Sequence, residues 1–65
     1  MKKQYFYIIK EGDKYISGNF MEGMTDDFHK AMRFPTEYAV QEFFGDLNKD
    51  RGFKIFEVEC IIREY

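Results

Sequence analysis

The sequence has few of the residues that build covalent or metal-dependent frameworks. It contains one cysteine, one histidine, one proline and no tryptophan. A single cysteine, Cys60, excludes an internal disulfide, and without a disulfide framework or a signal peptide we expect a cytoplasmic protein. Structural zinc sites use about four Cys or His ligands, so His29 and Cys60 are too few. We therefore expect neither a metal nor a cofactor.

Long apolar runs and an excess of one charge are also absent. No stretch approaches the roughly 18 apolar residues of a membrane span, and Lys10 and Glu11 interrupt the apolar start. Ten Lys and Arg against twelve Asp and Glu give a net charge of −2, with a pI near 5.3. Binders of duplex nucleic acid usually carry a basic face and a high pI. The composition therefore argues against a membrane-spanning protein and against a binder of duplex nucleic acid.

Aromatic residues are abundant instead, with eight Phe and five Tyr in 65 residues. A chain of this length forms one domain, residues 1–65, and buries only about 60% of its unfolded surface. Each Phe or Tyr can bury roughly 150–250 Å², so a few of them suffice for a core. We infer that the surplus aromatic residues form a contact surface.

Residues 36–52 (TEYAVQEFFGDLNKDRG) have the pattern of one amphipathic helix. Thr36 is the expected N-cap, and Gly52 suits the left-handed position after a helix. The apolar positions share one face at 3.6-residue periodicity; they are Ala39, Val40, Phe43, Phe44 and Leu47. Gly45 either allows close approach of the sheet or marks an early end.

Residues 4–10 and 14–19 are expected to form a hairpin around Gly12 and Asp13, with glycine first as in a type II′ turn. We place Glu11 opposite Lys14, Ile9 opposite Tyr15 and Ile8 opposite Ile16. That register puts Phe6, Ile8 and Ile16 on the face toward the helix, with Tyr5, Tyr7, Ile9 and Tyr15 on the other.

Residues 53–62 (FKIFEVECII) form the last expected strand. We assign Phe56, Val58, Cys60 and Ile62 to the helix side, and Glu57 and Glu59 to solvent. We predict an α+β fold, in which the right-handed crossover rule allows the helix to bring the last strand parallel to the second, with the first strand between them. It is a ββαβ unit whose three-stranded antiparallel sheet has the order 2-1-3 and packs on one helix. A short extra strand near residues 31–34 fits before Pro35.

The segments YFYIIKEGDKYIS, KAMRFPTEYAV and FKIFEVEC together resemble small ββαβ accessory proteins of Firmicutes phages and prophages. Ala31, Phe34 and Thr36, followed by Ala39 and Val40, approximate that family's A-x-x-F-x-T-x-x-x-A pattern. The resemblance covers most of the chain, although its motif positions are mainly caps and core. It implies an accessory protein in the host cytoplasm that binds and inhibits a host or defence protein.

Three groups of residues could carry chemistry. His29 lies near Asp26 and Asp27, but general acid–base catalysis needs a positioned partner in a pocket, so we expect an exposed loop histidine. Cys60 has no cationic neighbour to activate its thiol, so we expect a core residue. Glu57 and Glu59 lie about 7 Å apart on one strand face, where they protect a sheet edge. We expect no enzyme.

The expected open sheet face carries the main candidate site, Tyr5, Tyr7, Ile9 and Tyr15. Tyrosine is enriched at protein interfaces, which favours binding and modulation of a host protein, with a homodimer as a further possibility. Aromatic sheet faces also stack single-stranded nucleic acid, and this is the alternative function. Equally, the loop of residues 20–34 could fold over the face through Met21, Met24 and Phe28 and bury it.

Overall fold

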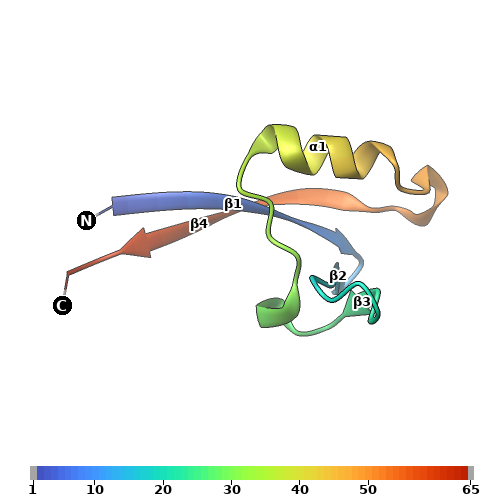
Figure 1. Ribbon diagram of the computed structural model, residues 1–65, viewed down its shortest axis with the longest axis horizontal. Helices are drawn as coiled ribbons and strands as arrows, with labels where there is room; N and C mark the ends of the chain where they lie inside the picture. Colours follow the sequence, from blue (N-terminus) through green and yellow to red (C-terminus); the bar gives the residue numbers. More distant parts are fainter. Residues whose placement is uncertain (1, 65) are drawn as a thin grey trace.

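One α-helix and four antiparallel strands make up the fold in the computed structural model, which describes residues 2–64 (Figure 1). The strands are β1 (Lys2–Glu11), β2 (Lys14–Ile16), β3 (Met24–Thr25) and β4 (Lys54–Ile62), and the helix is α1 (Glu37–Gly45). Two short 3-10 helices, η1 (Phe28–Lys30) and η2 (Lys49–Arg51), lie in the connections. The sheet order is β3-β2-β1-β4, so the α+β class and the inner position of β1 are confirmed.

The fourth strand lies elsewhere than predicted. It is β3, which pairs with β2 through Tyr15–Thr25 and Ile16–Met24. The segment predicted to be a strand, residues 31–34, contributes only two isolated bridges, Ala31 to Ser17 and Phe34 to Tyr7. Because this segment crosses from one side of the sheet to the other, it touches two strand edges without running along either (Figure 1).

Helix α1 begins as predicted. The Thr36 hydroxyl accepts a hydrogen bond from the Ala39 N–H at 3.1 Å, which confirms the N-cap. The helix does not continue to Gly52 but stops at Gly45, so the early end expected as one of the two roles of this glycine is confirmed. A methyl group on Gly45 would meet no atom within 4 Å, so this glycine does not serve close packing. Its cost of about 1 kcal/mol in a helix interior is consistent with the early end, while Gly52 ends η2 with a left-handed φ of 78°.

The hairpin turn is as predicted, whereas the register beyond it differs by one residue. Gly12 has a φ of 61°, as the first position of a type II′ turn requires, and Glu11 pairs with Lys14. The next pair is Lys10 with Tyr15, not Ile9 with Tyr15. Each residue in an antiparallel pair faces the same side as its partner. The predicted faces of β1 are therefore exchanged.

The predicted faces of β4 are exchanged for the same reason. Ile55 pairs with Ile9, and Phe56 pairs with Ile8. The core under α1 is formed by Ile9, Ile16, Phe34 and Val40. Of the predicted helix stripe, Val40 belongs to this core, and the other members pack against it partly buried. The residues that do so are Ala39, Phe43, Phe44 and Leu47, together with Tyr7, Met24, Met32, Phe53 and Ile55. Glu57 thus lies on the helix side of the sheet, and Phe56 lies on the opposite side.

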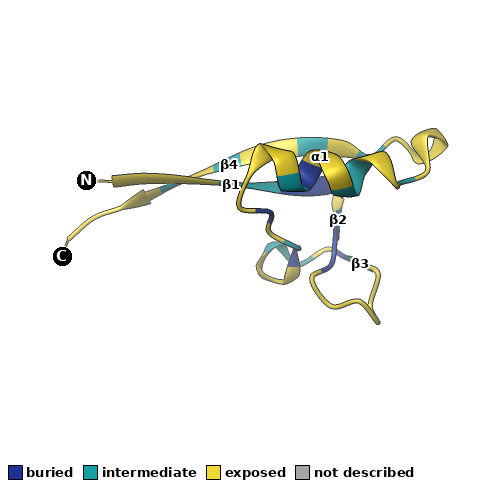
Figure 2. Ribbon diagram, turned by 45° about the horizontal axis from the view of Figure 1, so that its top comes forward, coloured by how far each residue is buried: buried dark blue, intermediate teal, exposed yellow. Residues whose placement is uncertain are grey.

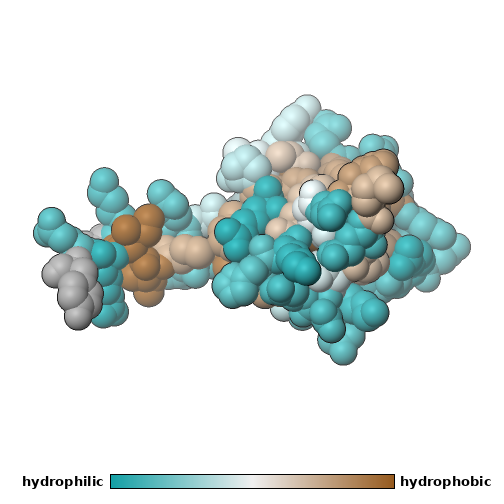
Figure 3. Space-filling model, turned by 60° about the horizontal axis from the view of Figure 1, so that its bottom comes forward, coloured by the Kyte–Doolittle hydropathy of each residue, from teal (hydrophilic) through white to brown (hydrophobic). Residues whose placement is uncertain are grey.

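The far halves of β1 and β4 project from this body as a two-stranded ribbon, which we call the arm (residues 2–5 and 59–62; Figures 1 and 2). The molecule measures 43 × 23 × 19 Å. Ile61 and Ile62 on the arm are 50% and 45% exposed, and an apolar patch on the arm is visible in Figure 3. In the described part of the chain, no helix is both long and apolar enough to cross a membrane.

One ion pair ties the hairpin to η2. The Arg51 guanidinium donates to both Glu11 carboxylate oxygens, at 2.8 and 2.6 Å, and stacks 4.8 Å from the Phe53 ring centre. The hydrogen bond from Arg51 lowers the pKa of Glu11 below its ordinary value of 4.5. A carboxylate whose folded-state pKa is lowered stabilises the fold above the unfolded pKa, and this contribution disappears as the pH falls through the folded value.

We expect an NMR titration to show Glu11 protonating at a lower pH than an ordinary glutamate. In the Arg51→Ala variant the Glu11 pKa should rise toward its ordinary value, since the hydrogen bond and the positive charge are removed. Lys49→Ala, which removes a neighbouring exposed cation of η2, is the matched control and should leave the titration unchanged. An equal rise in both variants would contradict the pairing.

Candidate binding surface

The four residues predicted to share an open face lie in different environments. Tyr5, Tyr7 and Ile9 project to the helix side of β1, and Tyr15 projects to the opposite side. Ile9 is 1% exposed in the core under α1. Tyr5 lies on the arm and is 46% exposed. The predicted tyrosine patch is therefore not present as one surface, because the register places Tyr15 with Lys10 rather than with Ile9.

Tyr7 is half-buried against the core rather than presented to solvent. Its hydroxyl donates a hydrogen bond to Glu57 at 3.3 Å, and its backbone pairs with Phe34 at 2.8 and 2.9 Å. Desolvation and the nearby Glu57 charge raise the pKa of Tyr7. These contacts make Tyr7 a link between the sheet and the segment before α1.

A different set of aromatic residues occupies the sheet face opposite α1. We call this set the aromatic–cationic face; it consists of Phe6, Lys10, Tyr15, Phe28, Arg33 and Phe56. The residues come from β1, β2, β4 and the segment around η1. They meet because even-numbered β1 residues, Tyr15 and Phe56 share one side of the sheet.

Lys10 lies between two rings of this face. Its ammonium nitrogen is 5.2 Å from the centre of the Tyr15 ring and 5.3 Å from that of Phe56. Both distances are within the roughly 6 Å over which a cation is attracted to an aromatic ring. Phe56 remains 43% exposed, so one wall of this arrangement is available to a ligand.

Arg33 and Phe28 form the other half of the face. The Arg33 guanidinium lies 5.2 Å from the Phe6 ring centre and 5.9 Å from that of Phe28. The Phe28 ring lies 6.3 Å from Phe6 and 5.7 Å from Tyr15. The 20–34 segment thus covers part of this face through Phe28, as one of the alternatives anticipated, while Arg33 stays exposed on top.

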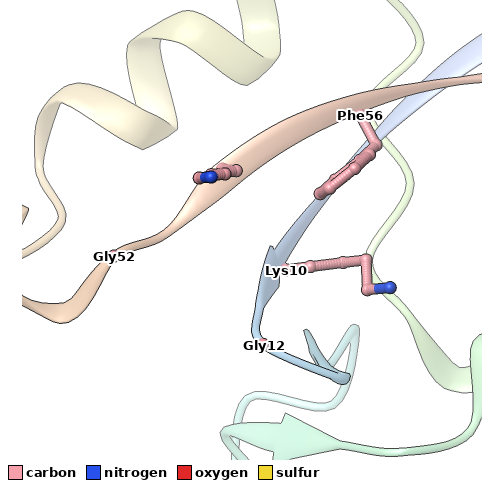
Figure 4. A pocket seen from close by; sticks show the side chains of 5 residues that line it. Lys10, Gly12, Gly52 and Phe56 are labelled. Atoms are coloured by element: carbon pink, nitrogen blue, oxygen red, sulfur yellow. The ribbon is translucent and has the colours of Figure 1, made fainter.

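A hollow of about 300 Å³ adjoins the face at the end of the β1–β4 pair (Figure 4). Lys10, Lys54, Phe56 and the backbone of Gly12 and Gly52 line it. Lys10 and Lys54 are direct cross-strand partners. Like charges directly opposite each other destabilise a strand pair, so an anionic group placed in the hollow would relieve this repulsion.

A second hollow, of about 290 Å³, lies on the helix side and is mainly apolar. Met24, Met32, Phe43, Leu47 and Phe53 contribute to its lining, and Phe20 forms part of its rim. Phe20 and the neighbouring Met21 are 94% and 89% exposed. Met21 therefore does not fold over the sheet, whereas Met24 packs on the core.

The remaining candidate residues make contacts of the kind that stabilise a fold. His29 is exposed within η1, and its backbone N–H donates to the Asp27 carboxylate at 2.9 Å. Glu59 pairs with Lys3 at 3.3 Å. Cys60 is a free thiol and only half-buried, in contrast to the expected core position. No group of three His, Cys, Asp or Glu residues that could hold a metal occurs within residues 2–64.

Sequence reasoning did not bring Lys10, Arg33, Lys54 and Phe56 together on one surface. The signal was available in the hairpin, because Glu11 opposite Lys14 already implies Lys10 opposite Tyr15. Extending that pairing gives a face of Phe6, Ile8, Lys10 and Tyr15. By contrast, nothing in the local pattern indicates that Phe28 and Arg33 return to cover Phe6.

Comparison with protein-family models, curated proteins and solved structures gave no match. The relation to phage accessory proteins therefore stays a prediction from the sequence.

Proposed function

We propose that this protein is a non-enzymatic binding module that contacts a partner protein through the aromatic–cationic face. The observation that carries the proposal is the position of Lys10 between Tyr15 and Phe56, beside Arg33 over Phe6 and Phe28. Aromatic and arginine side chains are the residues that most often dominate binding energy at interfaces. Here their geometry exists before any partner arrives, which lowers the entropic cost of binding.

The charges of this face indicate the chemistry of the partner. Lys10 and Arg33 on the face, with Lys54 in the adjoining hollow, give this region a local positive charge, although the chain as a whole carries −2. The Lys10–Lys54 pair favours an anionic group at the adjoining hollow. We therefore propose a partner segment with carboxylates beside aromatic or aliphatic side chains. The resemblance to phage proteins adds the proposal that this partner is a host protein, which the module modulates or inhibits.

The proposal predicts that Phe56→Ala and Arg33→Ala each weaken capture of the partner. Loss of a central aromatic or arginine contact costs about 2 kcal/mol or more, which is roughly thirtyfold in affinity. Immobilised protein would be exposed to bacterial host lysate, with bound proteins compared by quantitative mass spectrometry. Tyr38→Ala is the matched control, since Tyr38 is an aromatic residue on α1 that is 74% exposed.

A partner retained by wild type and Tyr38→Ala but lost by both face variants supports the proposal. A partner retained equally by all four proteins contradicts it. The second candidate, single-stranded nucleic acid, is favoured by the alternation of rings and cations, which resembles a stacking platform. Fluorescence anisotropy with a single-stranded oligonucleotide at low salt tests it, because electrostatic attraction is strongest there.

A further inference from the structure

Among the strands of the described residues, none pairs with the outer edge of β4 along its nine residues. Within residues 2–64, the backbone hydrogen bonds outside the helices and strands do not involve this strand. Its pairing with β1 runs without a bulge from Lys10–Lys54 to Lys2–Ile62. Natural edge strands are usually short, bulged, or protected by proline or charged side chains, because free N–H and C=O groups pair with other chains. Residues 55–62 have no bulge, proline or lysine, so the charges of Glu57 and Glu59 are the protection that this edge carries.

The arm makes this open edge more significant. An isolated two-stranded ribbon is at best marginally stable in water, yet residues 2–5 and 59–62 extend beyond the body in that form. Tyr5, Ile61 and Ile62 are about half exposed there. The two edges of the arm also differ, since β1 begins with Lys2 and Lys3, which discourage edge pairing. The β4 edge is therefore the side on which a further strand fits.

We propose that a second copy of this chain supplies that strand, with β4 pairing antiparallel to the second copy's β4 around a two-fold axis at Cys60. Directly opposite residues of an antiparallel pair face the same side, so the axis must pass through a residue paired with itself. This placement sets Glu57 opposite the second copy's Arg63, and Val58 opposite its Ile62. Each of these pairs occurs twice by symmetry.

Charge selects this register among the neighbouring ones. An axis at Val58 would place Glu57 against Glu59, and an axis at either glutamate would place it against itself; like charges directly opposite destabilise a sheet. An axis at Ile61 would direct Arg63 to Glu59, which already pairs with Lys3 at 3.3 Å. With the axis at Cys60, Arg63 instead neutralises Glu57, whose contact within the described chain is the Tyr7 hydroxyl.

An axis at Phe56 is disfavoured by the backbone. It creates no ion pair, and it runs Cys60 against Gly52, whose φ of 78° turns the chain out of the strand. The Cys60 axis joins two four-stranded sheets into one continuous sheet. Both copies of α1 then lie on one side, and both aromatic–cationic faces lie on the other. The dimer leaves those faces free, so the dimer and the proposed function can be tested independently of each other.

Charge reversal tests the register. Sedimentation of the full-length chain should show a reversible dimer, and Glu57→Arg or Arg63→Glu should each weaken it by roughly tenfold or more, since two attractive pairs become repulsive. The double variant Glu57→Arg/Arg63→Glu should restore the wild-type dimer. Circular dichroism of each variant checks folding. A chain that stays monomeric at millimolar concentration, or a dimer insensitive to both reversals, overturns the proposal.

Oxidative crosslinking gives a second test. Cross-strand partners have Cα atoms about 4.5–5.5 Å apart, which suits a disulfide, so diamide should join two chains through Cys60 by taking one hydrogen from each thiol. In the variant Val58→Cys/Cys60→Ser the two thiols lie four residues out of register, roughly 13 Å apart along the strands, and should not crosslink. Crosslinking through position 58 and not through Cys60 would overturn the register.

Discussion

Replacing Phe34 with alanine should lower the free energy of unfolding by about 3–5 kcal/mol, the range for large-to-small changes of a buried Phe. Phe34 is 7% exposed, and its ring centre lies 5.2 Å from that of Phe43 on α1. A chain of 65 residues has roughly 3–10 kcal/mol of total stability. This one substitution should therefore remove a large share of the total stability. Urea denaturation followed by circular dichroism measures it.

Phe20→Ala is the matched control for this experiment. Phe20 is 94% exposed, so the same chemical change should alter stability by no more than about 0.5 kcal/mol. Because both variants replace Phe with Ala, the difference between their free energies of unfolding reports the contribution of burial. Equal losses in the two variants would show that Phe34 does not form part of the core under α1.

Replacing Ile9 with alanine should destabilise the fold by about 2–5 kcal/mol, as other buried Ile→Ala changes do. Ile9 is 1% exposed and lies in the core with Ile16 and Val40. The experiment tests the contribution of Ile9 to the core under α1. Ile8, on the opposite face of β1, is likewise buried at 3% exposed, so both faces of the strand contribute to stability.

Ile61→Ala provides the control, since Ile61 is 50% exposed on the arm. Its effect should stay near or below about 0.5 kcal/mol when urea denaturation is measured at a protein concentration at which sedimentation shows the monomer. A small effect of Ile9→Ala, equal to that of Ile61→Ala, would contradict the observed packing.

Local signals were sufficient for the start of the helix and for the hairpin turn. Thr36 caps the helix because a threonine oxygen can accept the N–H three residues on, and this requires no distant contact. Gly12 allows the positive φ of the hairpin turn, again from its own chemistry. The apolar stripe of the helix could also be predicted from the sequence, because periodicity shows which residues share a face.

The candidate site was harder to predict from the sequence, because it depends on the strand register and on a segment that is distant along the chain. β1 is apolar on both faces, so hydrophobic pattern alone does not decide whether Ile8 or Ile9 meets the helix. A shift of one residue in the hairpin moved Tyr15 to the opposite side of the sheet. Phe28 and Arg33 join the face only because residues 26–34 pass under the sheet before rising to α1 (Figure 1).

The sequence by itself determined that this chain forms an α+β domain with β1 inside the sheet and one capped helix. These features follow from turn, cap and periodicity, which act over a few residues. Only the tertiary structure decided which side of the sheet the helix covers, which rings stay exposed, and that β4 ends in an open arm. The physical reason is that both faces of β1 can be buried equally well, so packing with α1 and Phe34 makes the choice.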